Sequence, residues 1–565
     1  MKRFYIFLTA SALAIFLTLL LAYPYTLISM EADDLFLFNR LFIGGVLERS
    51  AGVAVLIQDF VCQFFSTPWV GALIYTAIIT AATYLNYRSL AHLSREKLYW
   101  LALIPAPMVA AFSFPLINHS LNYLFYSILL YIFTIIRSSK WRFVYALLIA
   151  MPSFCLITWY EAALLIITFG TIELTDSRKK VTAALMLIPL VLTLVTPWLW
   201  SVSVNFIPLS QRPFTGIDET FSIGIACAYI VMLTSTILPS KIGSRSFVGY
   251  IVSPLAIAGF VAVIMSYGDL RFSERTSKIS TLADQKEWEE IIAELPLDEA
   301  TQSRIFTTYL LLAMSATENL PQILFATPVN SPELLMFRHD TRPFYANFNR
   351  QFYENIGIWN EAFHQAFEYG VTQRENECFK TLRFKTDYAI NSGNLGIARH
   401  YLDLLAQSSN NGKFVSERRT MLESKAREHS KPLPYMSDTF TGAYPMPSEM
   451  FRLYERNLKS KKLLDYVLCS LLLNKEVDKF GIILSKFNLY KGQELPRPYA
   501  EAIAVLAARD TSAHVIADYD HNIDKYFIDF KNRADQHQDV SEYASTYWNY
   551  LYFRQLEQNT DYSGK

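Results

Sequence analysis

The sequence predicts an all-α protein with two unlike halves, a polytopic membrane domain over residues 1–267 and a water-soluble helical-repeat domain after it. Nine apolar stretches fill the first half, each close to the ~20 residues with which a helix crosses a bilayer. The basic residues in the loops between these stretches lie mostly on one side of the predicted membrane. Residues 268–565 are polar and lack the alternating pattern of strands. The formal charge of zero therefore averages two different compositions.

We expect about nine transmembrane helices. Their approximate ranges are 4–23, 69–87, 98–115, 118–136, 143–158, 161–175, 181–200, 220–238 and 247–267. The short stretches 143–158 and 161–175 could instead be re-entrant or tilted, which would change the number by one pair. The first stretch follows Lys2 and Arg3 and runs unbroken to Ala22, longer than a usual signal-peptide core. A retained anchor is expected there, with cleavage as the alternative.

The loop charges predict the orientation. One side carries Lys2, Arg3, Arg88, Arg95, Lys97, Arg137, Lys140, Arg142, Arg178, Lys179, Lys180, Lys241 and Arg245, whereas the other carries only Arg40, Arg49 and Arg212. Short basic loops are retained in the cytoplasm, so the amino terminus is predicted inside. An odd number of crossings then puts the chain after Tyr267 outside. Adding or removing one pair of transmembrane helices does not change this prediction.

The exported half shows a repeat of helical hairpins. Three pairs of residues lie 36 positions apart: Gly357 and Gly393, Trp359 and Leu395, and Ala362 and Ala398. A glycine, a large apolar residue two later and an alanine three after that is typical of tetratricopeptide (TPR) repeats. A TPR-like domain is therefore expected over 268–429, with an all-α domain of another kind as the alternative. Stacked hairpins form a concave surface that suits a protein or peptide partner.

Further helices are expected after this domain, at 449–473, 476–488, 498–508, 512–533 and 539–557. They continue the helical array over 449–565. The stretch 430–448 contains four prolines and predicts a linker between the two helical groups.

Several motifs resemble an uncharacterised family of bacterial polytopic membrane proteins with a TPR-like carboxyl half. They are Gly44-Gly45, Gln63-Phe64-Phe65, Ala346-Asn347, the segment Gly357 to Ala362, and the closing Thr546 to Tyr550. The resemblance covers nearly the whole length. It implies a multi-pass protein of the bacterial inner membrane, and it implies no catalytic residues. In that membrane, the orientation predicted from the loop charges puts the carboxyl-terminal domain in the periplasm.

The first outer loop, over 24–68, carries three carboxylates within four positions, Glu31, Asp33 and Asp34. At a membrane boundary such a cluster is costly unless a cation lies near. Its placement resembles that in GT-C glycosyltransferases, whose acidic pair binds a divalent metal or activates the acceptor. The apolar stretch Leu35–Phe65 is long enough for two short interfacial helices, as in that superfamily.

Other outward residues could complete such a site. Asp33 or Asp34 would be the metal ligand or general base, with Glu31 and Glu161 as further catalytic candidates. Arg212 would bind the phosphate of a lipid-linked sugar, with His119 and Asn118 as further substrate contacts. Plainer interpretations also exist. Asp33 or Asp34 could cap a helix that begins at Leu35. Glu161 could lie in a boundary turn, and His119 could be an interfacial polar residue.

Several classes of chemistry are disfavoured. The sequence has no Walker loop, dinucleotide-binding glycine motif, nucleophile elbow, HExxH or paired CxxC, and no basic patch that would bind nucleic acid. The five cysteines form no metal or disulfide pattern, and Cys378 and Cys469 are expected as buried free thiols unless the fold brings them together.

Two functions from different classes remain, with a transporter as a third, minor one. The first is an inner-membrane platform whose repeats recruit a partner in cell-envelope assembly, which needs no cofactor. The second is a GT-C-like glycosyltransferase, which could use a divalent metal and a lipid-linked sugar at the periplasmic face.

Overall fold

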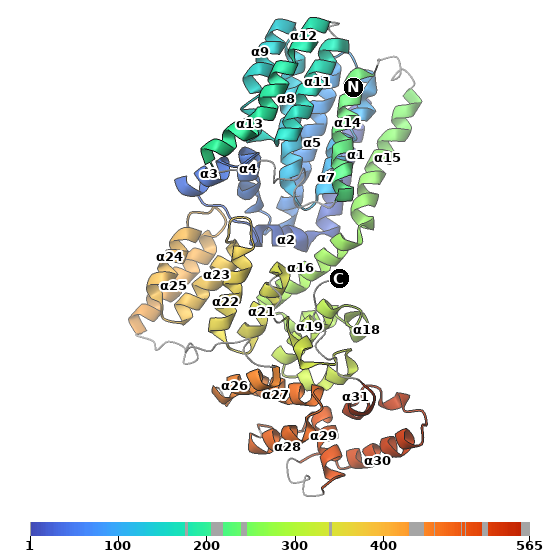
Figure 1. Cartoon of the computed structure of the whole chain (residues 1–565), viewed down its shortest axis with the longest axis vertical. Coiled ribbons are helices and arrows are strands. Elements are labelled where there is room, and N and C mark those ends of the chain that lie inside the picture. Colours follow the sequence, from blue (N-terminus) through green and yellow to red (C-terminus); the bar gives the residue numbers. More distant parts are fainter. Residues whose placement is uncertain are drawn as a thin grey trace. The chain divides into compact units, whose positions relative to one another are not determined.

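The computed structural model describes residues 2–175, 179–204, 219–238, 246–337, 342–428, 446–456, 458–487, 489–491, 493–510 and 518–554. Every regular element in these ranges is a helix (Figure 1). The chain forms two compact units. Unit 1 comprises Met1–Ser277 together with Asp403–Val415, and unit 2 comprises Lys278–Leu402 and Ser416–Lys565.

Unit 1 contains the apolar half of the chain. Its helices are α1 (Lys2–Ala22), α2 (Pro24–Ala32), α3 (Arg40–Leu47), α4 (Gly52–Cys62), α5 (Pro68–His92), α6 (Tyr99–Ala102), α7 (Pro105–Ser113), α8 (Ile117–Ile135), α9 (Ser139–Ile149), α10 (Ser153–Leu156), α11 (Trp159–Thr175), α12 (Lys180–Leu185), α13 (Leu187–Val204), α14 (Glu219–Ile237) and α15 (Ser246–Ser266). The long helix α16 (Gly268–Gln285) follows and passes from unit 1 into unit 2.

Four helical stretches in the described part of the chain are long and apolar enough to cross a membrane. They are Lys2–Ala22, Pro68–His92, Lys180–Leu199 and Val248–Ser266. At 1.5 Å per residue, the 21 residues of α1 span about 30 Å, the thickness of a hydrocarbon core. The apolar surface of these helices faces outward: Leu21 and Val181 are each 75% exposed and Leu255 is 63% exposed. A surface of this kind favours lipid over water as its surroundings.

Two of the expected membrane helices are not continuous. The stretch 98–115 is divided into α6 and α7, because Pro105 has no backbone N–H and begins a new helix. The stretch 143–158 is divided into α9 and the single turn α10, which follows Pro152. Neither stretch is a spanning helix of the usual length.

The two ends of unit 1 differ. In Figure 1 the long helices α5, α8 and α11 run side by side, and α2, α3 and α4 lie at the end away from the amino terminus. Helices α9 and α12 lie at the same end as the amino terminus. Buried side chains from α1, α5, α7, α8, α11 and α14 form one continuous core between these ends.

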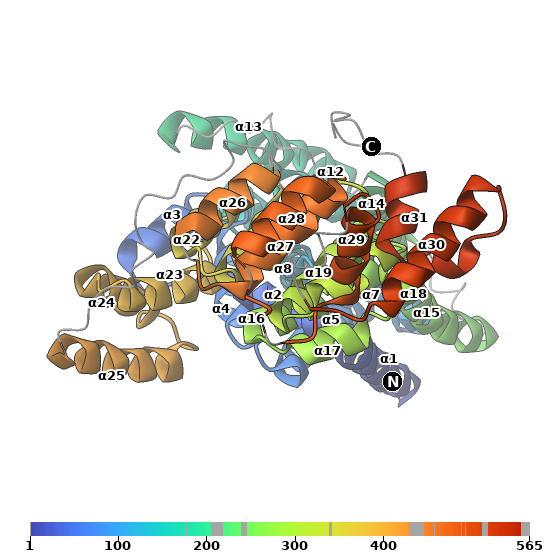
Figure 2. The ribbon, with the colours of Figure 1, turned by 90° about the horizontal axis from the view of Figure 1, so that it is seen from below.

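Unit 2 is an array of short helices. After the last part of α16 come α17 (Trp288–Glu294), α18 (Leu297–Ala300), α19 (Arg304–Ala316), α20 (Leu320–Ile323), α21 (Pro343–Asn355), α22 (Trp359–Val371), α23 (Phe379–Asn391), α24 (Leu395–Leu405), α25 (Gly412–Glu428), α26 (Met446–Arg456), α27 (Lys461–Leu473), α28 (Val477–Lys486), α29 (Arg497–Ala507), α30 (Asn522–Asp535) and α31 (Tyr547–Phe553). Successive helices pack together, as α26, α27 and α28 do in Figure 2. One hydrophobic core runs from Ile279 to Tyr550.

The same turn joins helices at five places in unit 2. A residue with positive φ ends one helix, and the next helix begins two residues later. These residues are Lys286 (φ 63°), Glu318 (61°), Gly357 (79°), Gly393 (78°) and Lys475 (59°). In each turn the N–H of this residue bonds to the carbonyl three positions earlier, and the next N–H bonds to the carbonyl five positions before it. This Schellman motif satisfies the last carbonyls of the helix and reverses the chain.

The later expected helices are confirmed with shorter bounds. The expected 449–473 is divided into α26 and α27, the described part of the expected 512–533 contains α30 from Asn522 onward, and the expected 539–557 contains the seven-residue α31. Most of the expected linker 430–448 lies outside the described residues, which resume at Met446. Cys378 and Cys469 are both buried, and no disulfide joins them to each other.

Candidate functional site

The loop over 24–68 contains two short helices, α3 and α4, in the stretch Leu35–Phe65 where two were expected. Asn39 caps α3, because its side-chain oxygen accepts the N–H of Phe42 at 2.8 Å. No helix begins at Leu35, so the interpretation of Asp33 or Asp34 as a cap for such a helix is wrong. Asp33 instead ends α2, where its N–H bonds to the carbonyl of Ser29 at 2.8 Å.

The three acidic residues of this loop have different surroundings. Glu31 is buried at 2% exposure, and its Oε1 accepts a hydrogen bond from Nδ2 of Asn410 at 3.0 Å. Asp34 accepts the N–H of Leu35 at 3.0 Å through Oδ1. Asp33 and Asp34 are partly exposed. Within the described residues, no group of three His, Cys, Asp or Glu side chains is arranged to hold a metal ion.

A segment far along the chain completes this loop. Residues Asp403–Val415 belong to unit 1, and the part from Gln407 to Asn410 follows the loop with its backbone and side chains. The N–H of Phe38 bonds to the carbonyl of Gln407 at 2.8 Å, and the N–H of Ser409 bonds to Oε1 of Gln63 at 2.7 Å. We call residues 407–410 the clasp.

Glu161 lies at the start of α11 and is fully buried. Its Oε2 accepts both the N–H of Thr158, at 2.9 Å, and the hydroxyl of Thr158, at 2.8 Å. Its Oε1 accepts the hydroxyl of Tyr229 on α14 at 2.7 Å. The Thr158-x-x-Glu161 spacing is half of a capping box, in which the glutamate satisfies the N–H of the cap residue. Glu161 therefore begins α11 and ties it to α14.

Two predicted substrate contacts, Asn118 and His119, lie in the first turn of α8, the helix that also contacts Glu161. Asn122 on α8 adds a further polar contact to Glu161, and His119 lies one turn earlier on the same helix with 3% exposure. The N–H of Asn118 bonds to Oε1 of Gln58 on α4 at 2.8 Å. Arg212 lies outside the described residues.

Sequence reasoning missed several buried polar residues in unit 1. Asp59 on α4 is fully buried, as is Asn86 on α5, and Gln63 is 1% exposed. A Gln58-Asp59 pair within an otherwise apolar stretch was the readable signal for the first of these. The Thr158-x-x-Glu161 spacing was the readable signal for the cap. Tyr229 gave none, because a tyrosine in an apolar stretch is common.

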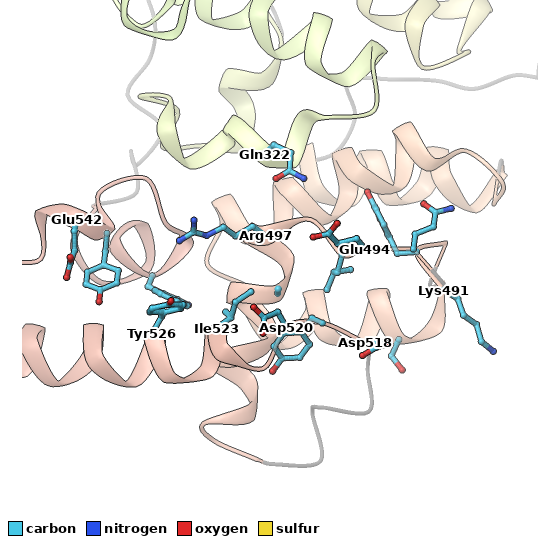
Figure 3. Close-up of a pocket in the computed structure, with 17 residues that line it drawn as sticks. Gln322, Lys491, Glu494, Arg497, Asp518, Asp520, Ile523, Tyr526 and Glu542 are labelled. Atoms are coloured by element: carbon cyan, nitrogen blue, oxygen red, sulfur yellow. The ribbon is translucent and has the colours of Figure 1, made fainter.

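Unit 2 contains a cavity of about 1350 Å³, which the sequence did not indicate. It lies among α20, the loop before α29, α29 itself, the chain that leads into α30, and α31. Figure 3 shows its side chains: Gln322 comes from α20, Glu494 from the loop, and Asp518 and Asp520 from the segment before α30.

Hydrogen bonds hold four of the aromatic side chains that line the cavity in place. The hydroxyl of Tyr490 donates to buried Asp465, that of Tyr519 donates to Asp524 at 2.8 Å, and that of Tyr543 donates to Asp529 at 2.7 Å. The indole N–H of Trp548 donates to the carbonyl of Glu501 at 2.9 Å. Tyr526 differs from these four, because it is 57% exposed. A wall fixed in this way loses little entropy when a ligand binds.

Two buried carboxyl groups, Asp465 and Glu501, accept hydrogen bonds from residues that line the cavity. Desolvation raises the pKa of Asp465 to about 6, although the hydroxyls of Tyr490 and Tyr499 oppose the shift. Desolvation also raises the pKa of Glu501 to about 7, against the N–H of Tyr547 and the Arg497 guanidinium. Arg497 lines the cavity, and its Nε donates to Oε1 of Glu501 at 3.0 Å. Carboxyl groups with shifted pKa values beside a cavity are typical of functional sites, and also of structural networks.

Comparison with family models matches residues 1–554 to one described as a family of unknown function (DUF6057). The chain belongs to this family. The match includes residues of both units, so the family model spans the apolar half and the helical array together. Comparison with curated proteins and with solved structures found no match.

Proposed function

We propose that this protein is a membrane-embedded platform whose helical unit binds a partner polypeptide during cell-envelope assembly. The observation that carries the proposal is the 1350 Å³ cavity in unit 2, whose aromatic walls are fixed by hydrogen bonds. It is larger than the usual 300–1000 Å³ of a small-molecule site, so it has room for several residues of a peptide. Fixed aromatic side chains are also the commonest anchors of protein interfaces.

The repeat architecture supports the same function. The five Schellman turns divide unit 2 into helical hairpins, and those at Gly357 and Gly393 are 36 residues apart. This spacing fits a TPR-like array, in which each hairpin packs on its neighbours and a binding surface forms across several of them.

The predicted topology would put this unit in the periplasm of a bacterium. Lys2 and Arg3 on α1, Arg142 on α9 and Lys180 on α12 belong to elements at one end of unit 1 (Figure 1). Basic residues gathered at one end favour a cytoplasmic location for that end. The first outer loop would then face the periplasm, as would unit 2.

Photo-crosslinking in living cells tests the platform. A photoreactive phenylalanine replaces Tyr526, which lines the cavity, or Ile528, which lies two residues later on α30 with nearly the same exposure but is not a lining residue. We expect one defined partner band from position 526 and none from position 528. Gln322→Trp/Gln493→Trp, at two exposed lining positions, should remove the band by filling the cavity. A band that is equal at both positions, or that survives this filling, would refute the proposal.

A GT-C-like glycosyltransferase is the second candidate. The observation that favours it is the pair of short helices α3 and α4 between the first two long helices, with the acidic residues directly before them. Asp33 or Asp34 would act as base or metal ligand, and Arg212 would bind the phosphate of the lipid-linked donor. The separate surroundings of Glu31 and Glu161 weigh against a shared site, because each already accepts hydrogen bonds from side chains nearby.

The envelope glycan profile tests this candidate. A deletion strain is complemented with the wild-type chain or with Asp33→Asn/Asp34→Asn, and protein levels are matched by immunoblot. The enzyme hypothesis requires that the deletion changes a glycan and that the double variant fails to restore it. Full restoration by the double variant would exclude these carboxylates from catalysis.

A further inference from the structure

The charges that line the unit 2 cavity are unequal. Three carboxylates, Glu494, Asp518 and Asp520, are exposed and form no ion pair with a described residue. The fourth, Glu542, pairs with Arg533 at 2.6 Å. Of the two lining cations, Arg497 is already bonded to Glu501. Lys491 remains, and in Figure 3 its side chain extends away from Glu494 and Asp520.

The unpaired carboxylates come from two separate segments of the chain. Asp518 and Asp520 lie two positions apart in a stretch without regular structure and are both exposed, whereas Tyr519 between them is only 9% exposed. Glu494 comes from the loop before α29, on another side of the cavity (Figure 3). Three like charges around one space repel each other, and a bound cation removes that cost.

The aromatic side chains suit the same ligand. Tyr526 on α30 lines the cavity and leaves 57% of its surface exposed. A lysine ammonium or an arginine guanidinium is attracted to the electron-rich face of a tyrosine ring. The remaining rings are each less than 10% exposed and are held by hydrogen bonds of their polar atoms, so they form fixed walls for an aliphatic stem.

We propose that the cavity binds an extended polypeptide segment and holds a lysine or arginine side chain of that segment among Glu494, Asp518 and Asp520, against Tyr526. The proposal rests on the proposed platform function and adds the chemistry of its partner. The cavity is larger than a metal ion or a single amine needs, and its unpaired lining charges are three carboxylates against the one ammonium of Lys491, so repulsion disfavours an acidic peptide.

Peptide binding to the full chain in lipid nanodiscs tests this inference. The probes are fluorescein-labelled decapeptides of alternating lysine and serine, or alternating glutamate and serine, followed by fluorescence anisotropy. We expect the lysine peptide to bind at least ten times more tightly than the glutamate peptide, and less tightly as salt is added. Chitohexaose is added as a competitor and should not displace it.

Two matched variants separate the cavity from the overall charge of the protein. Asp518→Asn/Asp520→Asn removes two of the unpaired charges and keeps the oxygen of residue 520 that accepts the N–H of Asn522. Glu289→Gln/Glu290→Gln removes two exposed carboxylates on α17, outside the cavity. Asp518→Asn/Asp520→Asn should weaken binding of the lysine peptide about tenfold or more. Glu289→Gln/Glu290→Gln should weaken it by less than twofold. Slow alkylation of buried Cys469 in both variants shows that the unit is folded.

Each contrary result has a definite meaning. Equal losses in the two variants mean that the peptide binds through overall charge, and the inference is wrong. Displacement by chitohexaose, or preference for the glutamate peptide, means that the cavity takes a different ligand, and the inference is again wrong. If position 526 nevertheless crosslinks a partner in cells, the platform function survives without this chemistry. If it crosslinks nothing, both fail.

Discussion

Glu501 is the residue that most directly couples the fold of unit 2 to pH. It is 2% exposed and joins α29 to α31: its carboxylate accepts bonds from Arg497 on its own helix and from the N–H of Tyr547, and its carbonyl accepts the indole N–H of Trp548. Its carboxyl group is well supplied with donors, yet burial outweighs them and raises its pKa from 4.5 to about 7.

This shift predicts that unit 2 loses stability as the pH rises. The folded chain keeps the Glu501 proton in a range where the unfolded chain has lost it, so the stabilisation is complete below about pH 4.5 and lost by about pH 7. The loss is on the order of 3 kcal/mol. The measurement is the urea midpoint for pulsed alkylation of Cys469 in the full chain at several pH values. Glu501→Gln should remove much of the pH dependence of this midpoint and leave the part due to Asp465. The control Glu290→Gln should leave the pH dependence unchanged. An unchanged slope in Glu501→Gln would contradict the assignment.

The contacts of Glu161 and of the acidic cluster at 31–34 could be predicted from the sequence only in part. The sequence indicated that Glu161 needs a partner, and its capping partner Thr158 could be read from the spacing. Its second partner, Tyr229, lies 68 positions away, and nothing local indicates which helix faces α11. The acidic cluster at 31–34 was predicted as one site because its members are adjacent in sequence, whereas Glu31 lies inside α2 and bonds to Asn410, Asp33 caps the end of α2 and Asp34 lies beyond it.

At the scale of elements, the hairpin turns were partly predictable. Gly357 and Gly393 were readable, because glycine is the residue that usually takes a positive φ. The equivalent turns at Lys286, Glu318 and Lys475 were not, because residues with side chains occupy the same conformation there. A side chain at positive φ strains the backbone, and packing of the flanking helices compensates for this strain. That packing depends on the fold as a whole.

The turn geometry predicts opposite effects for two glycines. Gly357→Ala should destabilise unit 2 by about 1–2 kcal/mol, since its φ is +79° and a Cβ meets no atom within 4 Å, which leaves backbone strain as the cause. Gly396→Ala, inside α24 and also without steric contact, should be neutral or stabilising by up to about 1 kcal/mol. The urea midpoint for alkylation of buried Cys378 reports both. Equal effects would mean that the turn at 357 is not as described.

At the scale of the whole molecule, contacts between distant parts of the sequence were beyond prediction. The clasp lies in the middle of the helical array by sequence, yet it belongs to the apolar unit and contacts a loop some 350 residues earlier. By contrast, the division into an apolar and a polar half, the all-α class and most helix positions followed from composition and periodicity alone. These properties depend on local sequence, whereas contacts of the clasp depend on the assembled chain.

The clasp gives a testable consequence. Asn410→Asp places a carboxylate where an amide now donates to Glu31, so like charges should release residues 407–410 from the loop. Hydrogen exchange of residues 38–39 and 407–411 should rise at least tenfold. Ser409→Ala is the control, because the bond to Gln63 uses the backbone N–H and should survive. Unchanged exchange in Asn410→Asp would show that the clasp does not depend on this bond.

The central claim is that the cavity of unit 2, and not the acidic loop, carries the function. The most direct measurement is growth of a deletion strain under envelope stress, complemented at equal protein level with Gln322→Trp/Gln493→Trp, with Asp33→Asn/Asp34→Asn, or with Ile528→Trp as the matched control. The account predicts that the filled cavity fails to rescue, while the other two variants rescue as the wild type does. Rescue by the filled cavity together with failure of Asp33→Asn/Asp34→Asn would contradict the platform and favour the enzyme.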